Sequence, residues 1–141
     1  MKKIKSFELD HTKLKKGLYI SRVDGNITSF DLRMKQPYKD ALLSPVEIHS
    51  FEHLLASVLR SGKLKDKILY VGPMGCATGF YVLVSDANID DFKPVLIDAL
   101  KFIAYECSEM YGGTKAECGN YKTLDLKIGK KCALDYLGVL L

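Results

Sequence analysis

The sequence has no run of about 18 consecutive apolar residues, the length that a membrane-spanning helix needs. It has no internal repeat, no low-complexity tract and no change in composition that would mark a linker. Its first residues, MKKIKSFELDH, become acidic where a secretory signal would be apolar. With 141 residues, 48% of them apolar, we expect a single domain over residues 1–141, no membrane association and a cytoplasmic location.

Arginine-rich tracts and interleaved basic and aromatic residues are also missing. The chain has 21 Lys and Arg against 17 Asp and Glu, a formal net charge of +4. The basic clusters are short, as at Lys130–Lys131, and are typical of a solvated surface rather than of a nucleic-acid footprint. We therefore expect no nucleic-acid partner.

The four cysteines, Cys76, Cys107, Cys118 and Cys132, form no CxxC pair. In a cytosolic chain such residues are free thiols, metal ligands or nucleophiles before they are disulfides. Cys118 is in a turn-forming stretch, and Cys76 lies within GPMGCATG, whose three glycines suggest close backbone approach or a positive φ. Cys107 has helical spacing with Ile103, which favours a core position, whereas Cys132 carries no signal.

Alternating patterns and turn residues predict two hairpins. The strands 17–23 and 27–34 flank a turn formed by Asp24, Gly25 and Asn26. The strands 67–71 and 79–85 flank the glycine-rich segment around Cys76.

Helices are predicted between and after these hairpins. Ser44, Pro45 and Glu47 form a capping box that begins a helix ending near Arg60. Further helices are predicted over 89–111 and near 130–140. Hairpins mixed with helices indicate a single-domain α+β fold with helices on one face of an antiparallel sheet.

The helix after Ser44 carries an unusual polar group. With His49 at 0° and about 100° per residue, Glu52 lies at about −60° and His53 at about 40°. The rest of the circumference is largely apolar, so burial of these three polar side chains is expected. Burial is costly unless something satisfies them, and a metal ion bound by histidines at i and i+4 would do so. The alternative is a hydrogen-bonded pair of core histidines.

Two histidines do not complete a metal site. His11 is the only other histidine, and both Cys76 and Cys118 could supply a thiolate, so which of them ligates and which reacts stays open. The order His-x-x-Glu-His is also that of the inverted zincins, in which Glu52 would activate water for peptide hydrolysis. A non-catalytic module with a closed, four-ligand metal site is a second alternative.

Five stretches, in this order, resemble the S-ribosylhomocysteine lyase (LuxS) family. They are SFELDH (6–11), FDLRMKQP (30–37), HSFEHLL (49–55), GPMGCATGFY (72–81) and ECGNY (117–121). The combination is highly specific, whereas HxxEH alone is not.

The resemblance implies a homodimeric α+β enzyme with its sites at the subunit interface. Such an enzyme cleaves S-ribosylhomocysteine to homocysteine and 4,5-dihydroxy-2,3-pentanedione, which is the precursor of the autoinducer-2 quorum-sensing signal. The same reaction is a step of methyl-cycle salvage. The family match implies one divalent metal per subunit, Fe²⁺ with Zn²⁺ or Co²⁺ as substitutes. The residues it implies are His49, His53 and Cys118 as metal ligands, Cys76 and Glu52 for proton transfer, and Ser6, His11 and Arg33 as substrate contacts.

The chain departs from the family pattern at three positions. Tyr70 and Gly72 stand where many members have an aspartate and a serine, and Leu124 replaces a common histidine. These differences concern substrate contacts, because all five metal and acid–base positions are retained.

Overall fold

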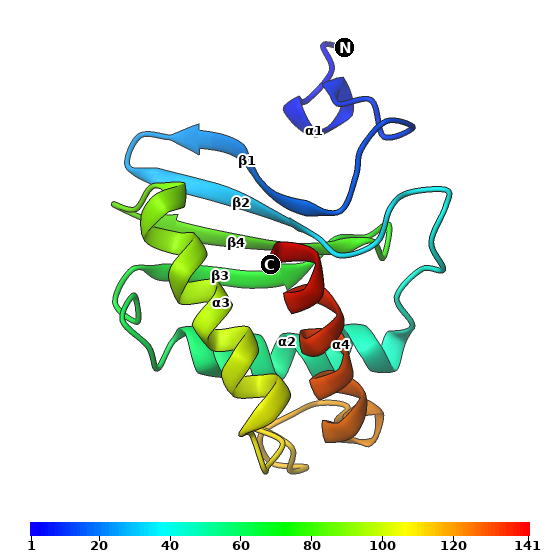
Figure 1. Cartoon of the computed structure of the whole chain (residues 1–141), viewed down its shortest axis with the longest axis vertical. Coiled ribbons are helices and arrows are strands. Elements are labelled where there is room, and N and C mark those ends of the chain that lie inside the picture. Colours follow the sequence, from blue (N-terminus) through cyan, green and yellow to red (C-terminus); the bar gives the residue numbers. More distant parts are fainter.

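The computed structural model describes residues 1–141 and contains one four-stranded antiparallel sheet with helices against one of its faces (Figure 1). The strand order across the sheet is β1-β2-β4-β3. Both predicted hairpins are confirmed, as is the α+β class. The strands are β1 (Gly17–Asp24), β2 (Ile27–Arg33), β3 (Ile68–Pro73) and β4 (Gly79–Ser85).

Four α-helices and one 3-10 helix complete the chain. They are α1 (Lys5–Glu8), α2 (Pro45–Leu59), α3 (Ile89–Tyr105), the 3-10 helix η1 (Tyr121–Thr123) and α4 (Leu126–Leu140). The predicted capping box begins α2, because Ser44 Oγ accepts from the Glu47 amide at 3.1 Å and Glu47 Oε1 accepts from the Ser44 amide at 2.9 Å. No helix combines the length and the apolar character needed to cross a membrane.

The long helix predicted over 89–111 ends six residues early, at Tyr105. The Cys107 amide donates back to Phe102 O at 2.9 Å, which closes the last turn, and the Cys107 side chain is buried. Lys130 Nζ of α4 donates to Cys107 O at 2.5 Å, so a side chain from another helix satisfies the carbonyl where α3 stops. The expected burial of Cys107 is therefore confirmed, although the residue lies outside the helix.

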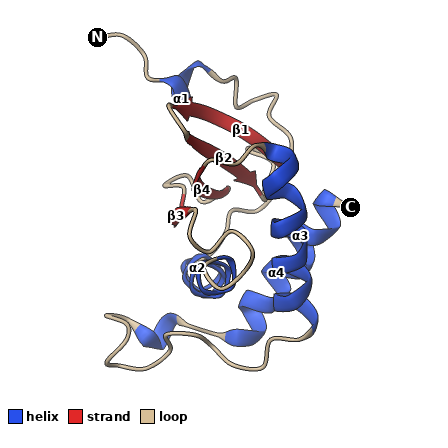
Figure 2. Ribbon diagram, turned by 90° about the vertical axis from the view of Figure 1, so that its left-hand side faces the viewer, coloured by secondary structure: helices blue, strands red, loops and turns tan.

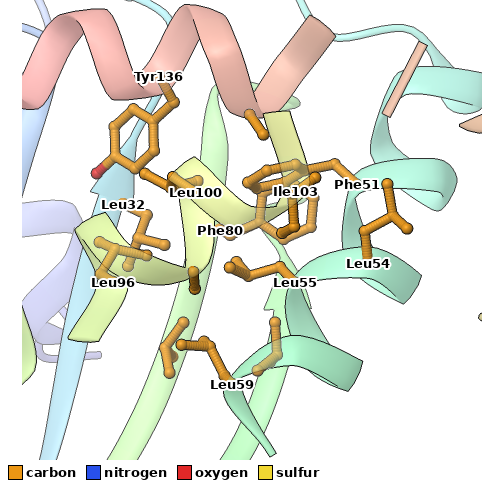
Figure 3. Close-up of a cluster of buried hydrophobic side chains, with 14 of the residues drawn as sticks. Leu32, Phe51, Leu54, Leu55, Leu59, Phe80, Leu96, Leu100, Ile103 and Tyr136 are labelled. Atoms are coloured by element: carbon orange, nitrogen blue, oxygen red, sulfur yellow. The ribbon is translucent and has the colours of Figure 1, made fainter. Parts of the chain in front are cut away.

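The core lies between the sheet and helices α2, α3 and α4 (Figure 3). Phe30 of β2 stacks on Phe92 of α3 with ring centroids 4.3 Å apart. Phe51 of α2 packs edge-on against Phe80 of β4 at 5.2 Å. The first contact holds α3 and the second holds α2 against the sheet, and the second determines which face of α2 carries its polar residues outward.

The other face of the sheet carries no long helix (Figure 2). Its side chains alternate with those of the core, so Asp31 and Arg33 of β2 and Tyr81 of β4 lie there. Together with residues of the N-terminal segment, these three side chains line a cavity of about 350 Å³. The N-terminal segment thus flanks this face of the sheet.

Candidate metal centre

His49, His53 and Cys118 come together beside α2. One ligand atom from each lies within 4.8 Å of the other two. The imidazole rings are 4.7 Å apart and nearly perpendicular, and Cys118 Sγ is 3.4 Å from His49 Nε2. The structure therefore places two imidazoles and one thiol where they can hold a metal ion.

These polar residues are less buried than the sequence led us to expect. Helix α2 buries Phe51, Leu54 and Leu55, but His49 and His53 are only half-buried. The reason is that α3, α4 and the sheet cover only the opposite face of α2. The metal-competent face of the helix therefore stays accessible from one side of the single chain.

Each histidine is held by its Nδ1 atom. His53 Nδ1 donates to the carbonyl oxygen of Tyr111 at 2.9 Å, and His49 Nδ1 lies 2.5 Å from Thr123 Oγ1. Both Nε2 atoms remain available to bind a metal ion, which is the arrangement typical of metal-binding histidines. Two imidazole nitrogens and one thiolate suit Zn²⁺, Fe²⁺ or Co²⁺, and leave a coordination position open.

The loop that carries Cys118 is tied to α2 near the histidines. The Asp125 amide donates to Ser50 Oγ at 2.8 Å, and Ser50 is buried next to His49 in the helix. The Asn120 amide donates to Cys118 Sγ at 3.4 Å. The loop thus positions a sulfur ligand and supplies a donor to it.

Glu52 lies on the same side of α2 but does not join the ligand cluster. It is half-buried, and none of the ion pairs in the chain involves its carboxylate. A carboxylate held near a metal site without a fixed partner can accept and return a proton.

Cys76 lies elsewhere, in the turn between β3 and β4. It is exposed at a cavity of about 410 Å³, whose lining contains none of the three metal-competent residues. The cavity is lined by His11, Pro37, Tyr38, Asp40, Leu42, Cys76 and Thr78. One chain therefore presents the thiol and the metal centre as two separate features.

Two of the three glycines around Cys76, Gly72 and Gly79, serve close approach, and Gly75 has open space where its Cβ would be. A Cβ at Gly79 would lie 2.1 Å from Leu32 O, while the positive φ of this turn, 60°, belongs to Ala77. A Cβ at Gly72 would lie 2.1 Å from the Tyr70 hydroxyl oxygen, because that ring lies over the glycine. The two departures from the family pattern, Tyr70 and Gly72, are therefore in contact with each other.

Arg33 links Cys76 to the buried polar group of β2. Its guanidinium pairs with Asp31 in a bidentate manner at 2.6 and 3.1 Å, and its Nη1 donates to Thr78 Oγ1 at 2.8 Å. The same Nη1 lies 4.0 Å from Cys76 Sγ, which is also 3.1 Å from Thr78 Oγ1. Burial raises the pKa of Asp31, and the pairing with Arg33 opposes that rise.

Ser6, His11 and Arg33 line the 350 Å³ cavity on the outer face of the sheet. His11 also lines the Cys76 cavity, so the two cavities adjoin there. His11 Nδ1 is hydrogen-bonded to Leu9 O at 2.8 Å, which leaves Nε2 available. Arg33 is only 2% exposed, so its side chain is fixed by the protein before any ligand binds.

The sequence did not predict the groups that hydrogen-bond to the side chains of the site and hold them in place. Thr123, Thr78 and the carbonyl of Tyr111 carry no pattern of their own, because each acts through a contact between segments far apart in the chain. Gly112, where φ is +66°, also lies against the site, because a Cβ there would be 3.0 Å from His53 Nδ1. The glycine pair at 112–113 was the only available signal.

The fold and the site define an α+β protein with a His₂Cys group that can hold a metal, and comparisons with known proteins specify its family. The family model described as S-ribosylhomocysteinase (LuxS) matches residues 4–140. The S-ribosylhomocysteine lyase of Finegoldia magna is 40% identical over 99% of this chain and 92% of its own length. The S-ribosylhomocysteine lyase of Desulfotalea psychrophila is 42% identical over 96% of this chain and 89% of its own length. That of Porphyromonas gingivalis is 42% identical over 97% of this chain and 90% of its own length. The chain belongs to the S-ribosylhomocysteinase (LuxS) family.

Proposed function

We propose that this protein is an S-ribosylhomocysteine lyase that releases homocysteine and 4,5-dihydroxy-2,3-pentanedione. The family membership supports this, and the observation that carries the proposal is the joint presence of a His₂Cys group and an exposed thiol in a cavity. The whole chain, residues 1–141, acts as one metalloenzyme domain, a carbon–sulfur lyase.

One divalent metal per subunit is held by His49, His53 and Cys118. When bound, it supplies Lewis-acid stabilisation for the oxygen that becomes negative in each enolisation. Fe²⁺ is the expected native ion on the resemblance to the family, and the donor set equally accommodates Zn²⁺ or Co²⁺.

The reaction needs proton transfers at carbon. The sugar carbonyl migrates by two successive enolisations, and β-elimination then breaks the carbon–sulfur bond and expels homocysteine thiolate. Each enolisation removes a proton from a carbon beside a carbonyl and returns one to the neighbouring carbon. The elimination removes such a proton while the electron pair of the carbon–sulfur bond leaves with the thiolate. Cys76 and Glu52 are the groups proposed to move these protons: Arg33 and Thr78 hold the thiol at its cavity, and the carboxylate has no ion-pair partner.

Ser6, His11 and Arg33 are proposed to contact the substrate from the adjoining cavity. Arg33 does so as a fixed group, because Asp31 and Thr78 already hold it. Tyr70, whose ring lies over Gly72, changes the surface next to the Cys76 turn, so the contacts there differ from those of family members with aspartate and serine.

A homodimer with sites at its interface explains why the thiol and the metal centre are separate in one chain. The outer face of the sheet has no helical cover and presents apolar side chains such as Tyr70, which is 53% exposed. A second copy on this face would bring the Cys76 cavity of one subunit to the metal centre of the other. We also propose a cytoplasmic location, because both cysteine roles need reduced thiols.

The alternatives have less support. A metallopeptidase of the inverted-zincin type would use Glu52 and the metal, but it gives no role to Cys76 and its cavity. A closed, purely structural metal module needs four protein ligands, and the group contains three.

The test combines metal content after anaerobic purification with thiol release from S-ribosylhomocysteine. We expect one divalent ion per chain and release of homocysteine by the wild type. Cys76→Ala should keep its metal and fold yet lose about 10²–10⁴-fold in turnover, and Glu52→Gln should behave in the same way. Cys118→Ala should lose metal and activity together.

Near-normal turnover by Cys76→Ala would show that its thiol moves no proton in the reaction. Full metal content in Cys118→Ala would remove Cys118 from the ligand set. Hydrolysis of a peptide library by the metal-loaded wild type, without thiol release, would favour the peptidase alternative.

A further inference from the structure

The two histidines differ in the partner of their Nδ1 atom: for His49 it is a side-chain hydroxyl, and for His53 it is a backbone carbonyl. Thr123 Oγ1 lies 2.5 Å from His49 Nδ1, across 74 residues of sequence. Tyr111 O lies 2.9 Å from His53 Nδ1. A side-chain substitution can remove the first contact, but none can remove the second oxygen.

The Thr123 hydroxyl contacts two groups, the carbonyl oxygen of Asn120 and His49 Nδ1. A threonine hydroxyl has one proton to donate, and Thr123 Oγ1 donates it to Asn120 O at 3.1 Å, because a carbonyl can only accept. With its proton used in that bond, the hydroxyl oxygen can only accept from His49 Nδ1, 2.5 Å away. This pattern favours the tautomer of His49 with its proton on Nδ1, in which the Nε2 lone pair faces Cys118 Sγ at 3.4 Å.

Without this constraint the opposite tautomer would be favourable. A proton on His49 Nε2 could be donated to the Cys118 sulfur, which lies close enough to accept it. That tautomer blocks the nitrogen that a metal needs, so binding would first require a proton to move. A Thr123 hydroxyl that accepts from Nδ1 would disfavour this tautomer before the metal arrives.

The same loop contributes three elements of the site. It provides Cys118, the Asn120 amide that donates to the sulfur, and the Asn120 carbonyl that orients the Thr123 hydroxyl. The Asp125 amide fixes the end of this loop to Ser50 of α2. Docking of the loop thus sets the position of the sulfur and the tautomer of His49 together.

We infer that Thr123 is a positioning residue that fixes His49 as its Nδ1–H tautomer and so prepares Nε2 for the metal. This inference rests on the metal-binding part of the proposed function, but not on the identity of the substrate. It predicts that loss of the Thr123 hydroxyl changes the His49 tautomer in the metal-free protein and lowers the affinity for a metal ion.

The first experiment reads the tautomer of the metal-free protein by ¹⁵N NMR of the imidazoles, at a pH where they are neutral. We expect His49 as the Nδ1–H form in the wild type and in Thr123→Ser, which keeps the hydroxyl. In Thr123→Val, which has a similar volume but no hydroxyl, we expect a shift toward the Nε2–H form. A wild-type His49 protonated on Nε2 would overturn the inference without any variant, as would identical tautomers in the wild type and Thr123→Val.

The second experiment measures Zn²⁺ affinity by competition with a chelator, without substrate. Removal of the group that hydrogen-bonds a metal-binding histidine typically weakens metal binding about 10–100-fold, and this is the loss expected for Thr123→Val. Thr123→Ser should restore most of the affinity. Thr114→Val is the matched control, because the Thr114 hydroxyl bonds Glu117 in the same loop at 2.6 Å and contacts no ligand.

The outcomes separate this inference from the proposed function. Tight Zn²⁺ binding by both the wild type and Thr123→Val would refute the role of Thr123 and leave the lyase proposal intact. An equal loss in Thr114→Val and Thr123→Val would assign the effect to loop stability and would also refute it. No Zn²⁺ binding by the wild type would refute the metal centre itself, and with it the inference.

Discussion

The four cysteines show how far one residue type can differ with its surroundings. Cys76 is exposed at a cavity, Cys118 faces a histidine nitrogen, and Cys107 and Cys132 are buried. The sequence around each cysteine predicted that Cys76 and Cys118 lie at a functional site and that Cys107 lies in the core, but it gave no prediction for Cys132. The structure places Cys132 of α4 with its sulfur 3.8 Å from Glu47 Oε2, beside the beginning of α2.

The environment of Cys132 predicts a loss of stability in alkaline solution. Burial, followed by the nearby charge of Glu47, raises the pKa of the Cys132 thiol from 9.0 to about 12. The unfolded chain therefore loses this proton at lower pH than the folded chain, so the contribution to stability is full below about pH 9 and declines above it. The decline is at most about 1.4 kcal/mol per pH unit.

Urea unfolding of the wild type and Cys132→Ala between about pH 8 and pH 10 tests this expectation. The variant is less stable at pH 8 because of the lost packing, but its stability should fall less steeply with pH. Parallel curves for the two proteins would show that Cys132 is not responsible. Burial also raises the pKa of Tyr136, but this contribution is the same in both proteins, so the difference in slope between the two curves belongs to Cys132.

Tyr38 occupies a backbone position that does not suit it. Its φ is +66°, and the amide of Lys39 donates to Gln36 O at 3.2 Å across it. Pro37 and Tyr38 are thus the central residues of a turn whose second central position favours glycine or asparagine. The side chain is 87% exposed and lines the Cys76 cavity. Strain at such a place indicates function.

We predict that Tyr38→Asn stabilises the fold by about 1 kcal/mol and raises KM for S-ribosylhomocysteine. Asparagine tolerates the positive φ, but it removes aromatic surface from the cavity. Thermal unfolding and steady-state kinetics measure the two effects. Tyr105→Asn is the control, since Tyr105 is also exposed but lies at the end of α3 with ordinary backbone angles. Unchanged KM in Tyr38→Asn would contradict a substrate-facing role.

At the scale of elements, the crossing of α4 over α2 depends on one glycine. A Cβ at Gly129 would lie 2.6 Å from Leu54 Cδ1 and 3.2 Å from Ser50 Cβ. Ser50 is next to His49, so a displacement at this crossing is transmitted to the metal centre. Gly138, in the same helix, has open space where its Cβ would be.

Gly129→Ala should therefore destabilise the protein by about 1–3 kcal/mol, the usual cost of overpacking, and weaken Zn²⁺ binding. Gly138→Ala should stabilise it by about 0.5–1 kcal/mol, because alanine is the better helix former. Urea unfolding of the metal-free proteins and chelator competition measure the two properties. Equal effects of the two substitutions would exclude the close crossing as the cause.

Local signals predicted most of the elements well. The capping box at Ser44 placed the start of α2, and the Asp24-Gly25-Asn26 turn placed the first hairpin. The end of α3 was predicted wrongly, because apolar spacing continues to Cys107 while the chain turns into the core. The long-range bond from Lys130 to Cys107 O, which no local pattern reveals, accompanies that turn.

At the scale of the whole molecule, local spacing and family resemblance predicted different parts of the site. Spacing on one helix indicated that His49 and His53 share a face, and the structure confirms it. Choosing Cys118 over Cys76 as the companion of the histidines required the resemblance, and the structure places Cys118 beside them. The supporting contacts of Thr123 and Tyr111 depend on how distant segments pack, so they could be found only in three dimensions.

The separation of Cys76 from the metal centre leads to a prediction about two inactive variants. If each site takes its thiol from one subunit and its metal from the other, a dimer of one Cys76→Ala chain and one Cys118→Ala chain has one doubly defective site and one intact site. Random exchange of subunits makes half of the dimers mixed, so a mixture of the variants should recover about a quarter of wild-type activity.

Thiol release measured before and after subunit exchange tests this expectation, with each variant alone as the baseline. A mixture of Cys76→Ala with Glu52→Gln should also recover activity if Glu52 belongs to the metal side of the site. Cys118→Ala mixed with Glu52→Gln should not, because both defects then fall on that side. No recovery in any mixture, with exchange verified by mass spectrometry, would place the thiol and the metal of each site in the same chain.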